Sequence, residues 1–402
     1  MIIVDTILAI LALALAAPAL FLLIECVLAL LPRNGRHESS DSGAAPRTFV
    51  VIPAHNEASG IAPVIANIRS QLADGDRVIV VADNCTDDTA IVARRAGADV
   101  IERSSSADRG KGFAIEFAVR EIAKGQPPDV VILIDADCFI SADGIRRLAQ
   151  RAQRLDRPVQ AEYLLTAPPN PSARSVISAL AVLVKNRVRP RGLDHLCGAC
   201  HLTGSGMAFP WRLLKESPAL GANLVEDLQM GIELALLGHP ATAAPEAQVT
   251  SDLPSSAAAA HTQRRRWEHG HLATMASQAP RLIRRSVVSL DPRLLLLAFD
   301  LMIPPLALLV LTEATASGFL FVYWLATGFL PPLLISLSAA ACIVVAVMIA
   351  WIGFARSVLP LRFVYAIPAY IVWKLPLYLA LARRGKHDQW ERTQRDAESG
   401  SR

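Results

Sequence analysis

The sequence predicts an α/β protein whose parallel sheet is flanked along the chain by membrane-spanning helices. Of its 402 residues, 52% are hydrophobic and 19% are charged. This is too apolar for an ordinary soluble protein and too charged for one buried wholly in lipid. Both properties fit if the apolar residues are concentrated, and they are, in one block at each end. Between the blocks, short β-rich runs alternate with helical patterns.

The first apolar block runs from about Ile2 to Leu31. It is long enough for one transmembrane helix, which needs roughly 20 apolar residues. A signal peptide is the alternative, but the block is too long, no basic residue precedes it, and no small-x-small cleavage site stands ahead of Pro32. We therefore expect an uncleaved transmembrane anchor over residues 1–32.

The second apolar block gives a C-terminal transmembrane region over residues 294–382, followed by a polar tail over 383–402. Its length allows three or four spans. Basic residues flank both blocks, and the positive-inside rule places all these flanks in the cytoplasm. An even number of C-terminal spans is then required, and we expect four, with Arg356 and Arg362 indicating that one piece is interfacial or re-entrant. The flanking residues are Arg33, Arg36, Arg281, Arg284, Arg285, Arg293, Arg383, Arg384 and Lys386.

The region between the blocks, residues 46–285, has the pattern of a cytoplasmic sheet domain whose last helix lies at the membrane interface. Continuous apolar strands that alternate with amphipathic helices predict a parallel sheet covered on both faces. The expected strands are Arg47–Pro53, Arg77–Ala82 and Val130–Ile134, and the expected helices lie near Gly60–Leu72, Asp87–Ala96 and Gly110–Ala123.

Polar residues follow three of the expected strands, where a sheet of this kind binds its ligand. They are His55-Asn56-Glu57, Asp83-Asn84 and Asp135-Ala136-Asp137. The acids and amides indicate a polar, phosphorylated ligand. No G-x-G-x-x-G or Walker pattern follows the first strand, which argues against dinucleotide and P-loop sites.

Asp135 and Asp137 stand two apart after an apolar strand, so in extended chain both carboxylates face the same side. Mg²⁺ and Mn²⁺ favour one or two carboxylates together with phosphate oxygens. The alternative is a solvated turn at the end of the strand. The buried character of the preceding strand favours the divalent cation.

Three further motifs each allow a functional and a structural interpretation. Glu226-Asp227 opens a helix, where the dipole favours ionised acids, but for this pair taken alone helix capping is the favoured explanation. Gln263, Arg266 and Trp267 share one helical face, which also suits a membrane-surface helix. Lys111 stands between glycines, an arrangement that suits a phosphate or a solvated turn.

The stretch Cys197-Gly-Ala-Cys-His201 has the spacing of a c-type haem attachment site. The basic flanks place it in the cytoplasm, where thiols stay reduced, whereas this haem is attached outside the cytoplasm. A zinc site would need a second ligand pair at finger-like spacing, which the sequence lacks. We interpret the motif as incidental.

Taken in order, the motifs resemble the inverting glycosyltransferases of family 2, in particular the membrane-embedded branch similar to polysaccharide synthases. The motifs are Pro53-Ala-His-Asn-Glu57, Asp83, Arg109-Gly-Lys111, Asp135-Ala-Asp137, Thr203-Gly-Ser-Gly206, Glu226-Asp227 and Gln263-x-x-Arg-Trp267. The resemblance implies a Rossmann-like sheet of the GT-A type and transfer of a sugar from a nucleotide-diphosphate sugar. It further implies a lipid-linked or growing polysaccharide acceptor at the cytoplasmic face of a bacterial plasma membrane.

The same resemblance implies a role for each motif. Asp227, next to Glu226, is the general base, and Asp137 holds the metal, Mg²⁺ or Mn²⁺. The donor is bound by Pro53, His55, Glu57, Asp83, Lys111, Asp135 and Ala136, with Asp83 on the base and Asp135 on ribose or diphosphate. The acceptor and the diphosphate are bound by Gly204, Ser205, Gly206, Gln263, Arg266 and Trp267.

Other functions remain open from the sequence. A membrane-tethered nucleotidyltransferase uses a similar sheet and metal, but it releases pyrophosphate and does not need Glu226-Asp227. A processive synthase that secretes its product also fits Gln263-x-x-Arg-Trp267, and a scaffold with a degenerate sheet is a non-enzymatic alternative. The net charge of +4 gives no sign of nucleic-acid binding.

Overall fold

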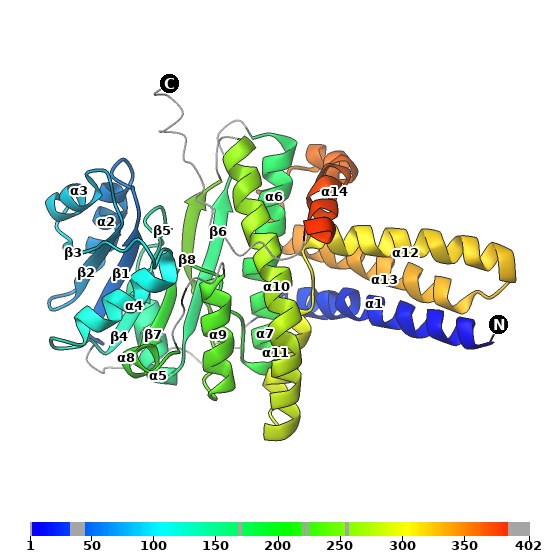
Figure 1. The fold of residues 1–402 in the computed structure, drawn as a ribbon, viewed down its shortest axis with the longest axis horizontal. Helices are drawn as coiled ribbons and strands as arrows, with labels where there is room; N and C mark the ends of the chain where they lie inside the picture. Colours follow the sequence, from blue (N-terminus) through cyan, green and yellow to red (C-terminus); the bar gives the residue numbers. More distant parts are fainter. Residues whose placement is uncertain are drawn as a thin grey trace. The chain divides into compact units, whose positions relative to one another are not determined.

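The computed structural model describes residues 2–32, 45–167, 171–218, 221, 225–253 and 257–384. They form two compact units (Figure 1). The sheet unit comprises the described residues of 34–168 and 198–270, and the helical unit comprises those of 1–33, 169–197 and 271–387. Most of the tail over 383–402, and the flanking Arg33, Arg36 and Lys386, lie outside the described residues.

The sheet has eight strands in the order β3-β2-β1-β4-β7-β6-β8-β5. Their bounds are β1 Thr48–Ala54, β2 Arg77–Asp83, β3 Asp99–Arg103, β4 Val130–Leu133, β5 Phe139–Ile140, β6 Val159–Thr166, β7 Met207–Pro210 and β8 Thr242–Asp252. The first four strands pair in parallel, as the sequence predicts. The remainder is mixed, because β7 runs antiparallel to both β4 and β6 while β6 and β8 are parallel.

Both faces of the parallel half are buried, which is why its strands read as continuous apolar runs. Alternate residues of β1, such as Phe49 and Val51, join a core with the helices on one face, while Val50 and Ile52 are buried on the other. The helices of this unit are α2 Ile61–Arg69, α3 Thr89–Arg95, α4 Lys111–Ile122, α5 Gly144–Leu155, α8 Trp211–Lys215 and α9 Glu226–Leu236. The long helix α10, Ala257–Ser289, begins in the sheet unit and ends in the helical unit.

The helical unit includes a stretch between β6 and β7 that the strand–helix pattern does not reveal. It consists of α6 Ala173–Leu183, a π-helical turn η1 Val184–Val188, and α7 Arg189–Cys197. Gly192 of α7 packs directly on α1, since a Cβ there would lie 2.1 Å from the carbonyl oxygen of Glu25. Arg189 of α7 forms ion pairs with Glu25 of α1 and with Asp300 of α11, so it connects the three helices. These contacts explain why residues 169–197 pack with the ends of the chain.

The remaining helices of this unit come from the two apolar blocks. They are α1 Ile2–Leu28, α11 Pro292–Leu301, α12 Leu306–Thr327, α13 Pro331–Ala350, the short turns η2 Trp351–Ala355 and η3 Leu361–Ala366, and α14 Ile367–Arg384. Figure 1 shows α1, α12 and α13 running side by side, and residues of the three helices share a small apolar core.

Within the described residues, three helices are long and apolar enough to cross a membrane: Ile2–Leu28, Leu306–Thr327 and Pro331–Ala355. The C-terminal block thus contains two such helices where we expected four. The difference lies at its ends, because α11 has only ten residues and the 18 residues of α14 include three basic ones, Lys374, Arg383 and Arg384.

Candidate active site

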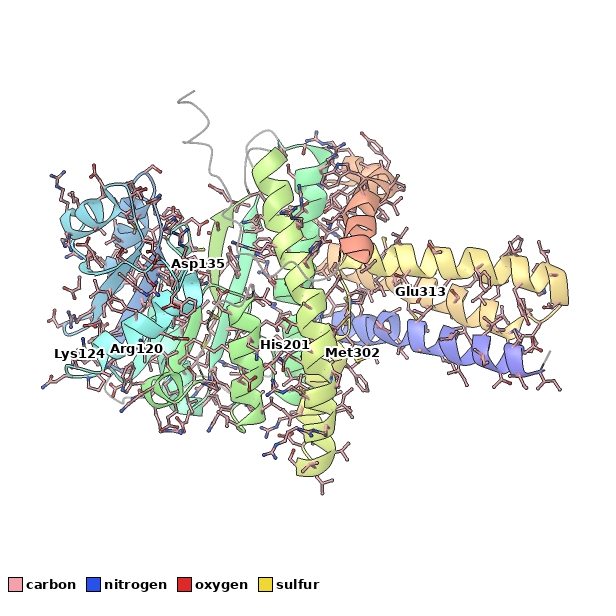
Figure 2. The ribbon with its side chains drawn as sticks, viewed as in Figure 1. Arg120, Lys124, Asp135, His201, Met302 and Glu313 are labelled. Carbon is pink, nitrogen blue, oxygen red and sulfur yellow. The ribbon has the colours of Figure 1, made fainter. Side chains whose placement is uncertain are left out.

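The topology brings the predicted strand-end residues to one edge of the sheet. Strands β2, β1 and β4 are parallel neighbours, so their carboxyl ends lie together. Asp83 ends β2, and His55 follows β1. Asp135, which Figure 2 labels, follows β4. Because β7 is antiparallel to β4, the loop Thr203–Gly206 that leads into β7 reaches the same edge.

Lys111 lies at the centre of this edge. As the first residue of α4, it places its Nζ atom 2.6 Å from the Asp135 carboxylate and 3.7 Å from that of Glu226. It also donates a hydrogen bond of 2.5 Å to the carbonyl oxygen of Gly204. Burial disfavours its charge, but the carboxylates of Asp135 and Glu226 outweigh this and raise the pKa of Lys111. The site therefore holds a fixed cation among acids.

Asp227 lies beside the same cluster, in the first turn of α9. Gly204 adopts φ +104°, and a Cβ at this position would lie 3.2 Å from Oδ2 of Asp227. A side chain at Gly204 would thus crowd the carboxylate, and glycine is the residue that adopts this backbone conformation without strain. The structure brings Asp227, Lys111 and Asp135 together, as the sequence-based hypothesis requires.

The neighbouring Glu226 has an unusual protonation equilibrium. Burial raises the pKa of its carboxyl from 4.5 to about 7, with Lys111 opposing the shift and Asp227 adding to it. Burial likewise raises the pKa of Asp135, partly offset by Lys111. The acids around Lys111 compete for one cation, so the pocket carries surplus negative charge that a further cation would neutralise.

Asp135, Asp137 and Cys138 form a group whose ligand atoms lie within 4.8 Å of one another. Cys138 is fully buried, and its burial, with the two carboxylates, raises the pKa of the thiol and keeps it protonated. The remaining donors are two carboxylates, the set that Mg²⁺ and Mn²⁺ accept while they bind phosphate oxygens. Ser251 of β8 donates a hydrogen bond of 3.1 Å to Oδ2 of Asp137. The residues present fit a hard divalent cation.

At the β2 end of the edge, Asp83 is buried and forms an ion pair of 2.6 Å with Arg103. Nδ1 of His55 lies 2.7 Å from the Asp83 carbonyl oxygen, so the loop after β1 is tied to β2. Pro53 pairs with Val81 in the sheet, and the amide of Glu57 donates to the hydroxyl of Thr89. No sequence pattern singles out Arg103, because its partner lies 20 residues away and the pairing depends on the register of β2 and β3.

The loop Thr203–Gly206 is held by Gln160 of β6, a residue that the motifs do not include. The buried Gln160 side chain accepts from the amide of Thr203 at 2.8 Å and donates to the carbonyl oxygen of Ser205 at 2.9 Å. The Ser205 hydroxyl accepts from the amide of Asp135 at 3.1 Å, which joins this loop to β4. The strand β6 carries Glu162 as well as Gln160, so the sequence pattern does not single out Gln160.

Gln263, Arg266 and Trp267 lie on α10 and are partly buried. Within the described part of the chain, none of them has a hydrogen bond or an ion pair to the Lys111 cluster. Nε of Arg266 is buried and has no hydrogen-bond partner among the residues that the structure covers. The Nε–H group of Arg266 is therefore available to donate to a ligand. The place of these three residues in the active site stays a prediction.

The mixed sheet with its acidic strand ends is a fold of the GT-A type, the class that the motifs indicated. Residues 46–270, more than half of the chain, match the family described as glycosyltransferase like family 2. The chain belongs to this family.

Curated relatives match over parts of the chain. The low-salt glycan biosynthesis hexosyltransferase Agl6 of Haloferax volcanii is 36% identical over 114 residues, 27% of this chain and 25% of the relative. Glycosyltransferase AglD of the same organism is 31% identical over 175 residues, 40% of this chain and 27% of the relative. The chain thus spans about a quarter of the length of these proteins.

Among solved structures, the fold is similar to that of the mannosyltransferase PcManGT from Pyrobaculum calidifontis, which is in complex with GDP-Man and Mn²⁺. The TM-score is 0.51 and the identity 20%, with 85% of this chain and 98% of that chain covered. This similarity concerns the fold.

Proposed function

We propose that the protein transfers a sugar, with inversion, from a nucleotide-diphosphate sugar to a lipid-linked or growing polysaccharide acceptor at the cytoplasmic face of a membrane. The observation that carries the proposal is the joint placement of Lys111, Asp135 and Asp227 at one edge of the sheet. Membership of the glycosyltransferase family supports the reaction class.

The donor end of the reaction requires that charge on the departing diphosphate be neutralised. Asp137, with Asp135, would hold a divalent cation, which when bound acts as a Lewis acid on the diphosphate oxygens. Lys111 supplies a second positive charge within the same pocket. Arg266, whose Nε has no hydrogen-bond partner within the described ranges, is suited to bind the diphosphate as well.

Asp83, together with His55 at the β1–β2 end of the edge, would bind the nucleoside. Arg103 positions Asp83 through their ion pair. Thr203 and the rest of the loop through Gly206 would line the junction between donor and acceptor. The buried hydroxyl of Thr203 has no hydrogen-bond partner in the part of the chain that the structure describes.

At the acceptor end, the carboxylate of Asp227 takes the proton from the attacking hydroxyl, which is a weak nucleophile until then. A single base with no carboxylate nucleophile gives in-line displacement and therefore inversion at the sugar carbon. The three candidate membrane helices support an acceptor that is itself held at a membrane.

Asp227→Asn tests this assignment. The substitution keeps the shape but removes the base, so we expect turnover to fall by about 10²–10⁴-fold. Binding of GDP or UDP with Mn²⁺, measured by calorimetry on the full-length protein, should stay within about threefold of wild type, since the base acts on the acceptor. Asp156→Asn, at an exposed aspartate beyond α5, is the matched control. Equal losses of nucleotide binding and turnover would refute the base role.

A further inference from the structure

The last turn of α10 and the residue after it expose large apolar side chains. Val287 is 69% exposed, Val288 70% and Leu290 86%. They lie outside the three candidate membrane spans. We call residues 281–290 the α10–α11 tip.

The tip is a fixed structure. The hydroxyl of Ser286 donates a hydrogen bond of 2.8 Å to the carbonyl oxygen of Asp291. The Asp291 carboxylate caps α11 at the amide of Arg293 and forms an ion pair of 2.7 Å with its guanidinium. Leu290 adopts φ +53°, a left-handed conformation that is strained for leucine and free for glycine. The chain thus holds a leucine in a strained conformation without burying it.

Arginines share the exposed face of the tip. Arg281, Arg284, Arg285 and Val288 follow the spacing i, i+3, i+4, i+7 and are exposed, whereas Leu282 is buried on the opposite side of the helix. In the described part of the chain, neither Arg284 nor Arg285 has an acidic partner. The surface therefore combines unneutralised positive charge with bare apolar groups.

The tip is tethered close to the membrane-spanning helices of its own unit. At its far end, α11 packs on α1, with the rings of Phe299 and Phe21 5.7 Å apart. Met302 then leads from α11 into α12 (Figure 2). The ten residues of α11 are about 15 Å long at 1.5 Å per residue. The tip is therefore joined to the chain that enters α12 by about 15 Å of helix.

We propose that the α10–α11 tip binds an anionic phospholipid surface. Arg284 and Arg285 contact the headgroups, and Val287, Val288 and Leu290 enter the boundary of the acyl chains. Two observations favour anionic lipid as the ligand. The arginines are complementary in charge to its headgroups, and the connection to α12 keeps the tip near the membrane. The sugar-transfer reaction plays no part in this inference.

Hydrogen exchange of the full-length protein tests the proposal in nanodiscs of phosphatidylcholine, with and without phosphatidylglycerol. We expect the amides of residues 286–290 to exchange more slowly in the anionic discs. The double variant Arg284→Gln/Arg285→Gln should lose most of this difference, by up to about 30-fold if each arginine contributes roughly 1 kcal/mol. Arg146→Gln/Arg147→Gln, which removes two adjacent exposed arginines from α5, is the matched control and should leave it unchanged.

A second variant addresses the apolar part. Leu290→Ser should speed exchange of the tip in anionic discs, whereas Leu237→Ser, at an exposed leucine of the sheet unit, should not. Equal exchange in neutral and anionic discs would overturn the proposal. Protection that instead grows with protein concentration in detergent would also overturn it, because the occupant would then be a second copy of the chain.

Discussion

In the proposed site, cation binding should depend on Asp137, because Lys111 already forms an ion pair with its neighbour Asp135. We expect Asp137→Ala to abolish the Mn²⁺ dependence of GDP or UDP binding, measured by titrating the metal against a fixed nucleotide concentration. Ser251→Ala should weaken metal binding by about 10–100-fold, since its hydroxyl orients the carboxylate. Asp99→Ala removes an exposed aspartate and should change nothing. An unaltered metal titration in Asp137→Ala would refute the assignment.

The buried carboxyl of Glu226 should make the free energy of unfolding depend on pH. Because burial raises its pKa to about 7, proton binding favours the folded state. This contribution is complete below about pH 4.5 and is lost as the pH rises through about 7. It amounts to roughly 3 kcal/mol at 1.36 kcal/mol per unit.

Glu226→Gln lacks this titration. Its Tm should therefore rise relative to that of wild type between about pH 5 and about pH 8, measured by thermal unfolding in detergent. Glu216→Gln, at an exposed glutamate after α8, is the control and should follow wild type. Parallel Tm profiles for wild type and Glu226→Gln would contradict the buried environment.

At this scale the sequence predicted the acids and Lys111 but missed the groups that orient them. Asp135 and Asp137 were recognisable because they follow an apolar strand. Arg103, Gln160 and Ser251 come from β3, β6 and β8, and their partners are set by strand register, which the sequence pattern alone does not specify.

Among the elements, the turn that leads into β7 is the tightest point of the site. Gly206 donates to Leu133 of β4 and accepts from Ala161 of β6, both at 2.9 Å. Its φ is +72°, and a Cβ would lie 2.6 Å from Val249 and 2.7 Å from Ala161. Glycine here lets the loop Thr203–Gly206 pass between two strands toward Lys111.

Gly206→Ala should therefore lower the free energy of unfolding by about 2–4 kcal/mol, from backbone strain together with overpacking. Gly238→Ala provides the comparison, because Gly238 has φ +96° with no atom within 4 Å of its Cβ position. That variant should cost only about 1–2 kcal/mol. Equal shifts in Tm for the two variants would show that the close packing around Gly206 is not present in solution.

Elements whose apolar residues recur at a clear helical or strand spacing were predictable from the sequence. Elements that depend on tertiary contacts were not. Strands β1, β2 and β4 and helices α2, α3 and α4 lie within a few residues of the expected ranges. The short β5 exists because it pairs with β8, and α6 and α7 belong to the helical unit because they pack on helices from the ends of the chain. The count of long apolar helices differs from four because α11 and α14 are too short or too polar.

For the molecule as a whole, the chain joins a sheet unit of the GT-A type to a helical unit with candidate membrane spans. In the proposed reaction, the bond that breaks joins the sugar carbon to the diphosphate of the donor. A nucleotidyltransferase would instead cleave within the diphosphate, so the two readings differ in the product that leaves.

The most direct measurement incubates the purified full-length protein with a panel of nucleotide sugars, Mn²⁺ or Mg²⁺, and membrane lipid extract, and identifies the released product by mass spectrometry. The account predicts a nucleoside diphosphate from one donor, formed only with the cation and not by Asp227→Asn. Release of pyrophosphate, or a nucleoside diphosphate formed equally by Asp227→Asn, would contradict it.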